Sequence, residues 1–196
     1  MAEQPFRTIL IVSALVLFPI AIVHRVKSQA TRESLDRWQE GPFILFTLRP
    51  IGIATMLGLF AYMINPEWMA WSSMRVPVWL RWFGVGLGMA GGVLLVWTLR
   101  SIGKNLTDTV VTRREHTLVT RGPYRWVRHP FYDAVAMSVV ANALVAANWF
   151  LLAGGLVTFG LLVLRTSREE DRLVARFGDS YRDYMNRTGR FLPKLG

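Results

Sequence analysis

The sequence has no cysteine and few charged residues. The absence of Cys excludes disulfide bonds, thiolate metal ligands and cysteine nucleophiles. Only 18% of the 196 residues are Asp, Glu, Lys or Arg, whereas 52% are hydrophobic. A soluble domain of this length is normally more polar. The charges that remain are gathered in blocks between long uncharged stretches, which is typical of a protein that crosses a membrane.

Acidic residues are also scarce, and the formal net charge is +10. Such an excess would suit a nucleic-acid-binding protein, but here the Lys and Arg residues flank apolar stretches. Residues 24–42, 99–131 and 165–196 carry four, seven and eight of them, respectively. Under the positive-inside rule, these three segments lie in the cytoplasm. We therefore expect a lipid bilayer and no nucleic acid as partner, in a multi-pass protein of the bacterial inner membrane with its active site facing the cytoplasm.

Three apolar stretches, residues 6–23, 43–64 and 78–99, are long enough to span a membrane. A fourth, residues 134–164, has no charge and would be about 46 Å long as one helix, against a hydrocarbon core of about 30 Å. We interpret it as a hairpin of two short helices that turns near Asn148. The glycines Gly84, Gly88 and Gly92 are predicted to form one smooth face for helix packing.

The sequence thus predicts an all-α fold, an integral membrane helical bundle of about five transmembrane helices with a cytoplasmic connector and C-terminal helices. We expect a single membrane domain over residues 1–196. It divides into three spans (1–99), a connector (100–131), the hairpin (132–164) and C-terminal helices (165–196).

Two polar clusters flank the predicted hairpin, the run RHPFY at residues 128–132 and the pair Glu169-Glu170. Folding the hairpin brings both clusters to the same membrane face. His129 offers a hydrogen-bond donor near neutral pH and Arg128 a planar fork for a carboxylate. The two glutamates offer acceptors for an ammonium group or for ribose hydroxyls. Aromatic rings nearby offer flat surfaces for a base or a sulfonium, so the set suits a small zwitterionic ligand with an aromatic part.

Each feature also has a structural explanation. Arginines beside a span usually fix the orientation of the chain. Arg165 and Glu169 have helical pair spacing and could form a surface ion pair. A single His is more often structural than catalytic, and Tyr or Trp at the end of a span usually belongs to the interfacial belt. The joint placement of these residues around one hairpin favours a site.

The pattern GPYRWVRHPFY, an apolar hairpin, and then Arg165, Glu169-Glu170 and RFLP at 190–193 resembles the isoprenylcysteine carboxyl methyltransferase family. The close resemblance covers about residues 118–193. It implies an integral membrane enzyme that uses S-adenosylmethionine. It further implies cofactor contacts at Tyr124, His129, Tyr132 and Glu170 and a catalytic arginine, for which Arg165 is the candidate. The family pattern often has Gly where this sequence has Ala134, preceded by Asp133.

From this resemblance we expect methyl transfer to a lipophilic or small acceptor, whether carboxylate, thiol or amine. The expected site comprises the catalytic residues Arg165, Glu169 and Arg49, the cofactor-binding residues Tyr124, Arg128, His129, Pro130, Tyr132 and Glu170, and no metal. His129 and Glu170 are expected to bind the cofactor from opposite walls. Because the two glutamates and His129 are the only obvious bases, the sequence slightly favours an anionic acceptor.

Arg49 lies inside the second predicted span and is followed by Pro50. An arginine within a span is costly and is usually kept for function. We expect its guanidinium to contact the polar end of the acceptor. The alternative is that the side chain snorkels to the headgroups and contributes little else.

The sequence is also compatible with two other functions. One is a sterol reductase-like membrane enzyme that uses NADPH, although proteins of that kind are generally much longer. The other is a non-enzymatic membrane protein that binds a small molecule, which would tolerate substitution of His129 and Glu170.

Overall fold

The computed structural model describes residues 3–29, 42–102 and 118–194, and in these ranges the chain is helical with no strand. This confirms the all-α prediction. The helices are α1 (Glu3–Gln29), α2 (Pro42–Ile64), η2 (Pro66–Ser72), α3 (Val78–Ile102), η4 (Gly122–Arg125), α4 (Pro130–Ala146), α5 (Trp149–Phe177) and α6 (Asp179–Arg187).

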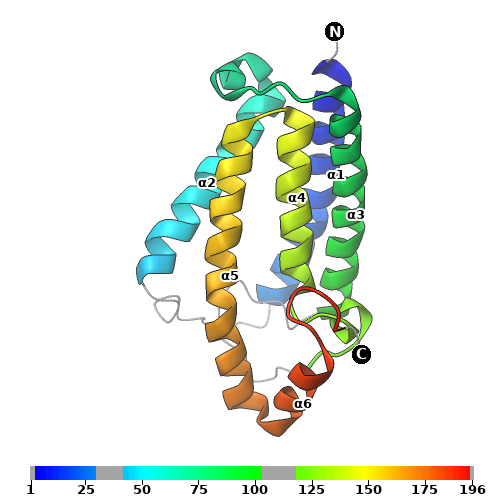
Figure 1. The fold of residues 1–196 in the computed structure, drawn as a ribbon, viewed down its shortest axis with the longest axis vertical. Helices are drawn as coiled ribbons and strands as arrows, with labels where there is room; N and C mark the ends of the chain where they lie inside the picture. Colours follow the sequence, from blue (N-terminus) through cyan, green and yellow to red (C-terminus); the bar gives the residue numbers. More distant parts are fainter. Residues whose placement is uncertain (1–2, 30–41, 103–117, 195–196) are drawn as a thin grey trace.

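Helices α1 to α5 form an upright bundle, with α6 and the C-terminal segment at its lower end (Figure 1). Helix α3 packs along α4, and α5 packs against both α4 and α2. The N-terminus lies at the upper end of the bundle and the C-terminus at the lower end (Figure 1). The first and last segments of the chain therefore lie at opposite ends of the apolar helices.

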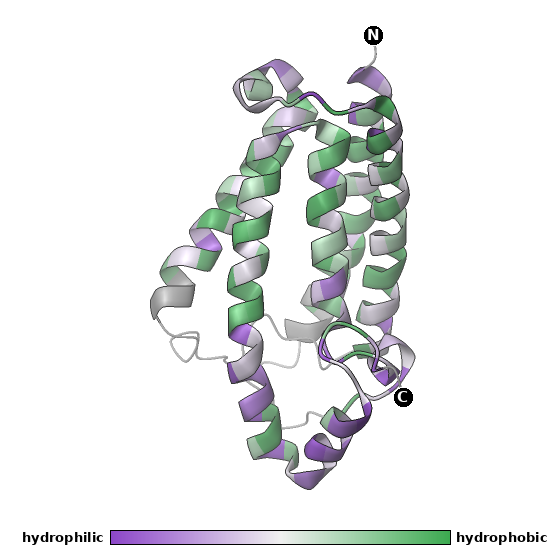
Figure 2. Cartoon of the chain, in the orientation of Figure 1, coloured by the Kyte–Doolittle hydropathy of each residue, from purple (hydrophilic) through white to green (hydrophobic). Residues whose placement is uncertain are grey.

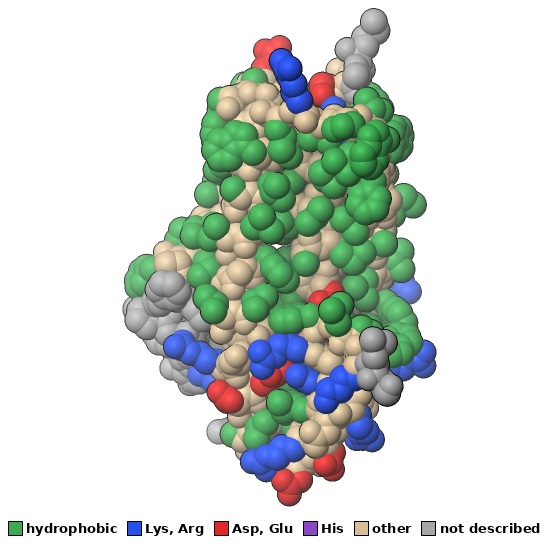
Figure 3. Space-filling model, viewed as in Figure 1, with side chains coloured by type: hydrophobic (Ala, Val, Ile, Leu, Met, Phe, Trp, Pro, Cys, Tyr) green, Lys and Arg blue, Asp and Glu red, His purple; other side chains and the backbone are tan. Residues whose placement is uncertain are grey.

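The bundle presents an apolar surface along most of its length. Side chains such as Leu15 and Met89 are each 70% exposed on its sides. Figure 2 shows the apolar residues along the helices, and Figure 3 shows Lys and Arg gathered around the lower end. Helices α1, α2, α3 and α5 contain stretches long and apolar enough to cross a membrane, and α4 is a shorter apolar helix of 17 residues. The chain is an integral multi-pass membrane protein.

Helix α5 differs from the predicted hairpin arm. The sequence suggested two short helices within residues 134–164, but α5 continues unbroken from Trp149 to Phe177. At 29 residues it is about 44 Å long, so its polar end extends beyond the apolar part of the bundle. The physical reason is that residues 165–176 contain no Gly or Pro and are rich in good helix formers. The break comes at Gly178, whose φ is +56°.

The glycines of α3 allow close packing against two helices, α4 and α1, instead of one. A Cβ at Gly84 would lie 2.8 Å from the Cβ of Leu144, and one at Gly91 would lie 3.0 Å from the Cβ of Met137. Both glycines therefore let α3 approach α4 closely. Gly92, which we expected on the same face, points instead toward Leu17 of α1.

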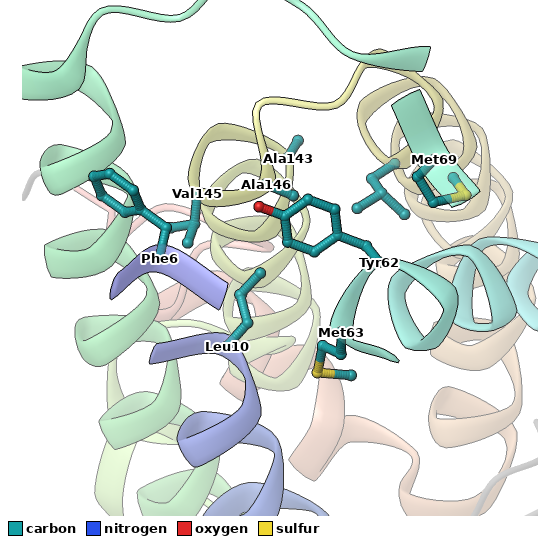
Figure 4. Close-up of a cluster of buried hydrophobic side chains, with 9 residues drawn as sticks. Phe6, Leu10, Tyr62, Met63, Met69, Ala143, Val145 and Ala146 are labelled. Atoms are coloured by element: carbon teal, nitrogen blue, oxygen red, sulfur yellow. The ribbon is translucent and has the colours of Figure 1, made fainter. Parts of the chain in front are cut away.

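A cluster of buried side chains fills the upper end of the bundle (Figure 4). It draws on four helices and η2, through Phe6, Leu10, Tyr62, Met63, Met69, Ala143, Val145, Ala146 and Leu151. The residues come from segments at both ends of the sequence. Their packing closes the bundle at the end opposite the C-terminus.

A buried hydrogen-bond network centred on Arg81 of α3 lies beside this cluster. Its guanidinium donates to both carboxylate oxygens of Glu3, at 2.6 and 2.9 Å, and to the carbonyl oxygen of Val145 at 2.7 Å. Arg81 is only 5% exposed and lies over the ring of Phe6. The Tyr62 hydroxyl donates to the same Glu3 carboxylate, at 2.9 Å. Buried Arg81 is therefore compensated by groups from α1 and α4, as a charge at this depth requires.

The turn between α4 and α5 is fixed by Asn148. Its Nδ2 donates to the hydroxyl of Ser72 at 2.8 Å and to the carbonyl of Met69 at 3.2 Å. Its Oδ1 accepts from the amide of Leu151 and caps α5. Ala147 before it has a φ of +48°, which brings its carbonyl to the amide of Met74. The turn that the sequence placed near Asn148 is thus tied to η2.

We expect Asn148→Ala to destabilise the protein by about 1–3 kcal/mol, because the Ser72 hydroxyl and the Met69 carbonyl lose a buried partner. Thermal unfolding in detergent micelles would measure the change. Asn186→Ala, on the exposed side of α6, is the matched control and should unfold like the wild type. Equal unfolding temperatures for the two variants would show that Asn148 does not hold the turn.

Candidate functional site

The segment before α4 is shaped to lie against the end of α3. Gly122 has a φ of +63°, and a Cβ at this position would lie 2.2 Å from the hydroxyl of Ser101. Glycine is therefore required both by the backbone and by the close approach. Next to this contact, the rings of Trp97 and Trp126 meet edge to face at 5.5 Å. Helix η4 and the residues after it are held at the lower end of the bundle.

The C-terminal segment pairs with residues 126–129. The amide of Arg128 donates to Gly189 O at 2.9 Å, and the amide of His129 donates to Arg190 O at 3.1 Å. The amide of Gly189 donates in turn to Trp126 O at 3.2 Å. No side chain fits at Gly189, because a Cβ would lie 1.6 Å from the carbonyl oxygen of Leu192. This pairing brings the tail beside the RHPFY run.

Glu170 is the centre of the polar network at this end. One carboxylate oxygen accepts from Arg128 Nε at 2.8 Å and lies 3.2 Å from His129 Nε2. The other accepts from Arg190 Nη2. Glu170 is 2% exposed, so its charge is balanced by protein groups instead of water. The bond to the carboxylate also raises the pKa of Arg190.

Arg128 extends the network to the end of α6. Its Nη1 donates to the carbonyl oxygens of Met185, at 3.2 Å, and of Thr188. A guanidinium at a helix C-terminus satisfies carbonyls that have no partner within the helix. Arg128 therefore links α5, α6 and the segment before α4.

Aromatic rings line the side of the network that faces α4. The rings of His129 and Tyr132 stack with an interplanar angle of 2° and centroids 5.4 Å apart. The ring of Phe191 lies 5.8 Å from His129. The Tyr132 hydroxyl donates to Glu169 Oε2 at 2.8 Å. The other oxygen of Glu169, Oε1, accepts no hydrogen bond from the described part of the chain.

A further tyrosine, Tyr184 of α6, supports the segment before α4, which contains Tyr124. The Tyr184 hydroxyl donates to the backbone carbonyl of Tyr124 at 2.6 Å. Burial raises the pKa of Tyr184 to about 12 and also raises the pKa of Tyr124 well above its usual value. Both phenols therefore stay protonated at neutral pH and can act only as neutral hydrogen-bonding groups.

The structure brings together five of the predicted site residues, Arg128, His129, Tyr132, Glu169 and Glu170. Pro130 is buried at the first turn of α4, where proline suits a helix start. Tyr124 is buried in η4. Arg165 is buried in α5, one turn before Glu169, and lies close enough to Tyr132 to act on its hydroxyl electrostatically. Arg49 is half-buried in α2.

One expectation about the geometry is wrong. His129 and Glu170 do not form opposite walls of a site, since His129 Nε2 lies 3.2 Å from Glu170 Oε1. The physical reason is that a buried carboxylate must be paired, and His129 is one of the three groups that pair with it.

Arg190 and Phe191 were not among the predicted site residues. They join the site because the C-terminal segment pairs with residues 126–129. This pairing cannot be predicted from any local sequence pattern. The one signal in the sequence was charge: Arg190 is a cation in the C-terminal segment, and the adjacent Glu169 and Glu170 need cationic partners. Among the described residues, no group of three or more His, Asp or Glu side chains could hold a metal ion.

Comparison with known proteins shows that this region is similar to membrane methyltransferases. The family model "Isoprenylcysteine carboxyl methyltransferase (ICMT) family" matches residues 84–175. A protein-S-isoprenylcysteine O-methyltransferase of Dictyostelium discoideum is 26% identical over 82% of this chain and 68% of that protein. A methanethiol S-methyltransferase of Mycobacterium tuberculosis is 28% identical over 80% of this chain and 56% of that protein.

Other relatives share a smaller part of their length. The nickel-cobalt-cadmium resistance protein NccN of Alcaligenes xylosoxydans is 30% identical over 58% of this chain and 53% of that protein. The solved structure of a eukaryotic intramembrane Ras methyltransferase, ICMT, superposes with a TM-score of 0.54 at 21% identity, covering 89% of this chain and 63% of that one. The chain thus has the same fold as that enzyme and spans about half the length of several curated relatives.

We expect Glu170→Gln to destabilise the lower end of the protein by about 3 kcal/mol or more, because Arg128 would remain buried without its counter-ion. The unfolding temperature in detergent should fall, and trypsin should cut the tail at Arg190 faster. Glu169→Gln removes only one acceptor and should have a smaller effect on both. If Glu170→Gln retains the wild-type unfolding temperature and tail protection, the network does not hold this end together.

Proposed function

We propose that this chain, which resembles the isoprenylcysteine carboxyl methyltransferase family in sequence and in fold, is an integral membrane methyltransferase. It transfers a methyl group from S-adenosylmethionine to a lipophilic or small acceptor (a carboxylate, thiol or amine) where the bundle meets the cytoplasm. The observation that carries the proposal is the polar network of Arg128, His129 and Glu170. It is built at the end of an apolar bundle and joined to stacked aromatic rings.

The donor set fits S-adenosylmethionine. Glu169 Oε1 is an acceptor for the ammonium group or a ribose hydroxyl of the cofactor. The rings of His129, Tyr132 and Phe191 offer faces that attract a sulfonium or stack with a base. Arg165 offers a guanidinium for the carboxylate group, beside Tyr132. We therefore propose that His129, Tyr132 and Phe191 contact the cofactor together with Glu169 and Arg165. Of the other residues expected from the resemblance, Arg128 and Glu170 position this set, and Tyr124 and Pro130 remain proposed cofactor-binding residues on the resemblance alone.

The residues of the site have different tasks in this proposal. When bound, the cofactor supplies a methyl group on a positively charged sulfur. Glu170 acts through Arg128 and His129, whose side chains it holds in place, because both of its own oxygens are already bonded. Tyr132 orients Glu169 through its hydroxyl. The apolar helices exclude water, which favours methyl transfer from a sulfonium because the reaction needs alignment and desolvation.

The charge distribution supports a cytoplasmic position for this end of the bundle. Lys and Arg gather around the lower end, where the C-terminus lies (Figures 1 and 3). By the positive-inside rule we propose that this face is cytoplasmic, and we propose the bacterial inner membrane as its location. The soluble cofactor would then reach the site from the cytoplasm, and a lipophilic acceptor would reach it from the bilayer.

Methyl-labelled S-adenosylmethionine should label a product in inverted membrane vesicles that carry the protein and a native lipid extract. Sealed right-side-out vesicles should remain inactive, because the cofactor cannot cross the bilayer. Glu169→Gln should weaken cofactor binding by roughly ten- to a hundredfold, the cost of one charge-assisted hydrogen bond, as measured by calorimetry. If no product is labelled and S-adenosylmethionine does not bind, the protein is not a methyltransferase. Binding of NADPH instead would indicate a reductase.

Arg49 in α2 is proposed to contact the polar end of the acceptor. Arg49→Leu should then leave cofactor affinity unchanged and lower methyl transfer to a lipophilic acceptor by roughly tenfold or more. Arg49→Lys should recover part of the rate, because it keeps the charge but loses the planar fork. Full turnover in Arg49→Leu would mean that the arginine only reaches to the headgroups.

A further inference from the structure

Asp133 is an acid near the site that forms no ion pair with any described residue. It lies in the first turn of α4 and is half-buried. Its backbone amide donates to His129 O at 3.3 Å, but neither carboxylate oxygen makes a hydrogen bond or ion pair with any described residue. The two glutamates of the site differ in this respect, since Glu169 is bonded to Tyr132 and Glu170 to three groups.

The position of Asp133 is costly for a carboxylate. The uncharged stretch 134–164 begins at the next residue. The N-terminus of α4 favours an acid in the first turn, but such an effect offsets only part of the cost of burial beside apolar helices. Ionisable residues in membrane helices are usually paired or mark the path of a substrate. Since no described residue pairs with its carboxylate, Asp133 fits the second case.

Helical spacing places Asp133 next to the site. It follows His129 by four residues, so both lie on the same face of the helix start. Asp133 is about 6 Å farther along the helix axis, toward the apolar part of the bundle. The charge of His129 also acts on Asp133 electrostatically. The carboxylate thus lies between the polar network and the hydrocarbon, where a lipophilic acceptor would bring its head group.

The charges around this turn discriminate between acceptors. The described charged groups of the site are Arg128, His129, Arg190 and Glu170 in the network, with Glu169 and Arg165 on α5. Arg190 and Glu170 bond to each other, whereas no described cation lies within ion-pair distance of Asp133. A carboxylate acceptor would meet repulsion at Asp133. An ammonium group would find both a counter-ion and a hydrogen-bond acceptor there.

We propose that Asp133 contacts the acceptor directly, and that the acceptor is a lipophilic amine whose ammonium form Asp133 binds and deprotonates. This rests on the methyltransferase function proposed above. In the step, an N–H bond of the ammonium breaks and an O–H bond forms on the carboxylate, while the electron pair stays on nitrogen. The neutral amine can then accept a methyl group, which its ammonium form cannot. The amine class replaces the anionic acceptor that the sequence slightly favoured.

Binding without cofactor tests the first half of the proposal. The protein in phosphatidylcholine nanodiscs is titrated with a long-chain primary amine and with the carboxylate of the same chain length. The amine should bind more tightly than the carboxylate, and Asp133→Asn should weaken amine binding about tenfold or more. Asp183→Asn, the same change on the exposed face of α6, is the control and should bind like the wild type. Equal amine affinity in Asp133→Asn and wild type would overturn the proposal.

Methyl transfer tests the second half. With labelled S-adenosylmethionine, the wild type should methylate the long-chain amine, and Asp133→Asn should lose roughly a hundredfold or more in rate, as expected for a missing base. Asp133→Glu should recover part of the rate, and cofactor affinity and unfolding temperature should stay unchanged in both variants. Preferred methylation of the matching thiol or carboxylate, or a full rate in Asp133→Asn, would overturn this inference alone. Failure to bind the cofactor at all would instead overturn the proposed function.

Discussion

The need to balance one buried carboxylate shapes the lower end of the molecule. Glu170 is almost inaccessible to solvent, and a charge in that position is tolerated only with good partners. Its partners come from residues 128–129, ahead of the hairpin, and from Arg190 near the end of the chain. The carboxylate therefore joins three segments that are distant in sequence. Without it, the tail and residues 128–129 would lose their ion pairs with α5.

Buried polar networks matter here because, in a bilayer, the hydrophobic effect no longer drives helices to pack against each other. Lipid tails are as apolar as the side chains of the helices, so association depends on close contact and on hydrogen bonds. The glycines of α3 supply the close contact with α4. Arg81 with Glu3 at one end, and Glu170 with its three partners at the other, supply the polar contacts. The apolar middle of the bundle is thus held from both ends.

The sequence predicted well what hydropathy determines and poorly what depends on pairing. The helical fold and the gathering of Arg128, Tyr132 and Glu169 follow from one apolar stretch between two polar clusters. The full length of α5 was missed because hydropathy marks the end of the apolar stretch, while helix propensity continues beyond it. The direct contact between His129 and Glu170, and the role of Arg190, depend on which charges meet after folding. Spacing along the chain does not contain that information.

The acids of the site differ in how far their charges are balanced by the fold. Those that are fully bonded maintain the structure, and those that are not remain available for chemistry. An acid whose oxygens are all bonded within the protein, such as Glu170, cannot give up those bonds to a ligand without exposing a buried cation. Glu169 has one oxygen bonded and, among the described residues, one without a bond, so it can be held in place and still bind. Neither oxygen of Asp133 is bonded to a described residue, and no described cation forms an ion pair with it, although His129 acts on it electrostatically. The more completely the fold balances a charge, the less that charge can change during a reaction. Candidates for binding and proton transfer are therefore to be sought among the acids that the fold leaves unbalanced.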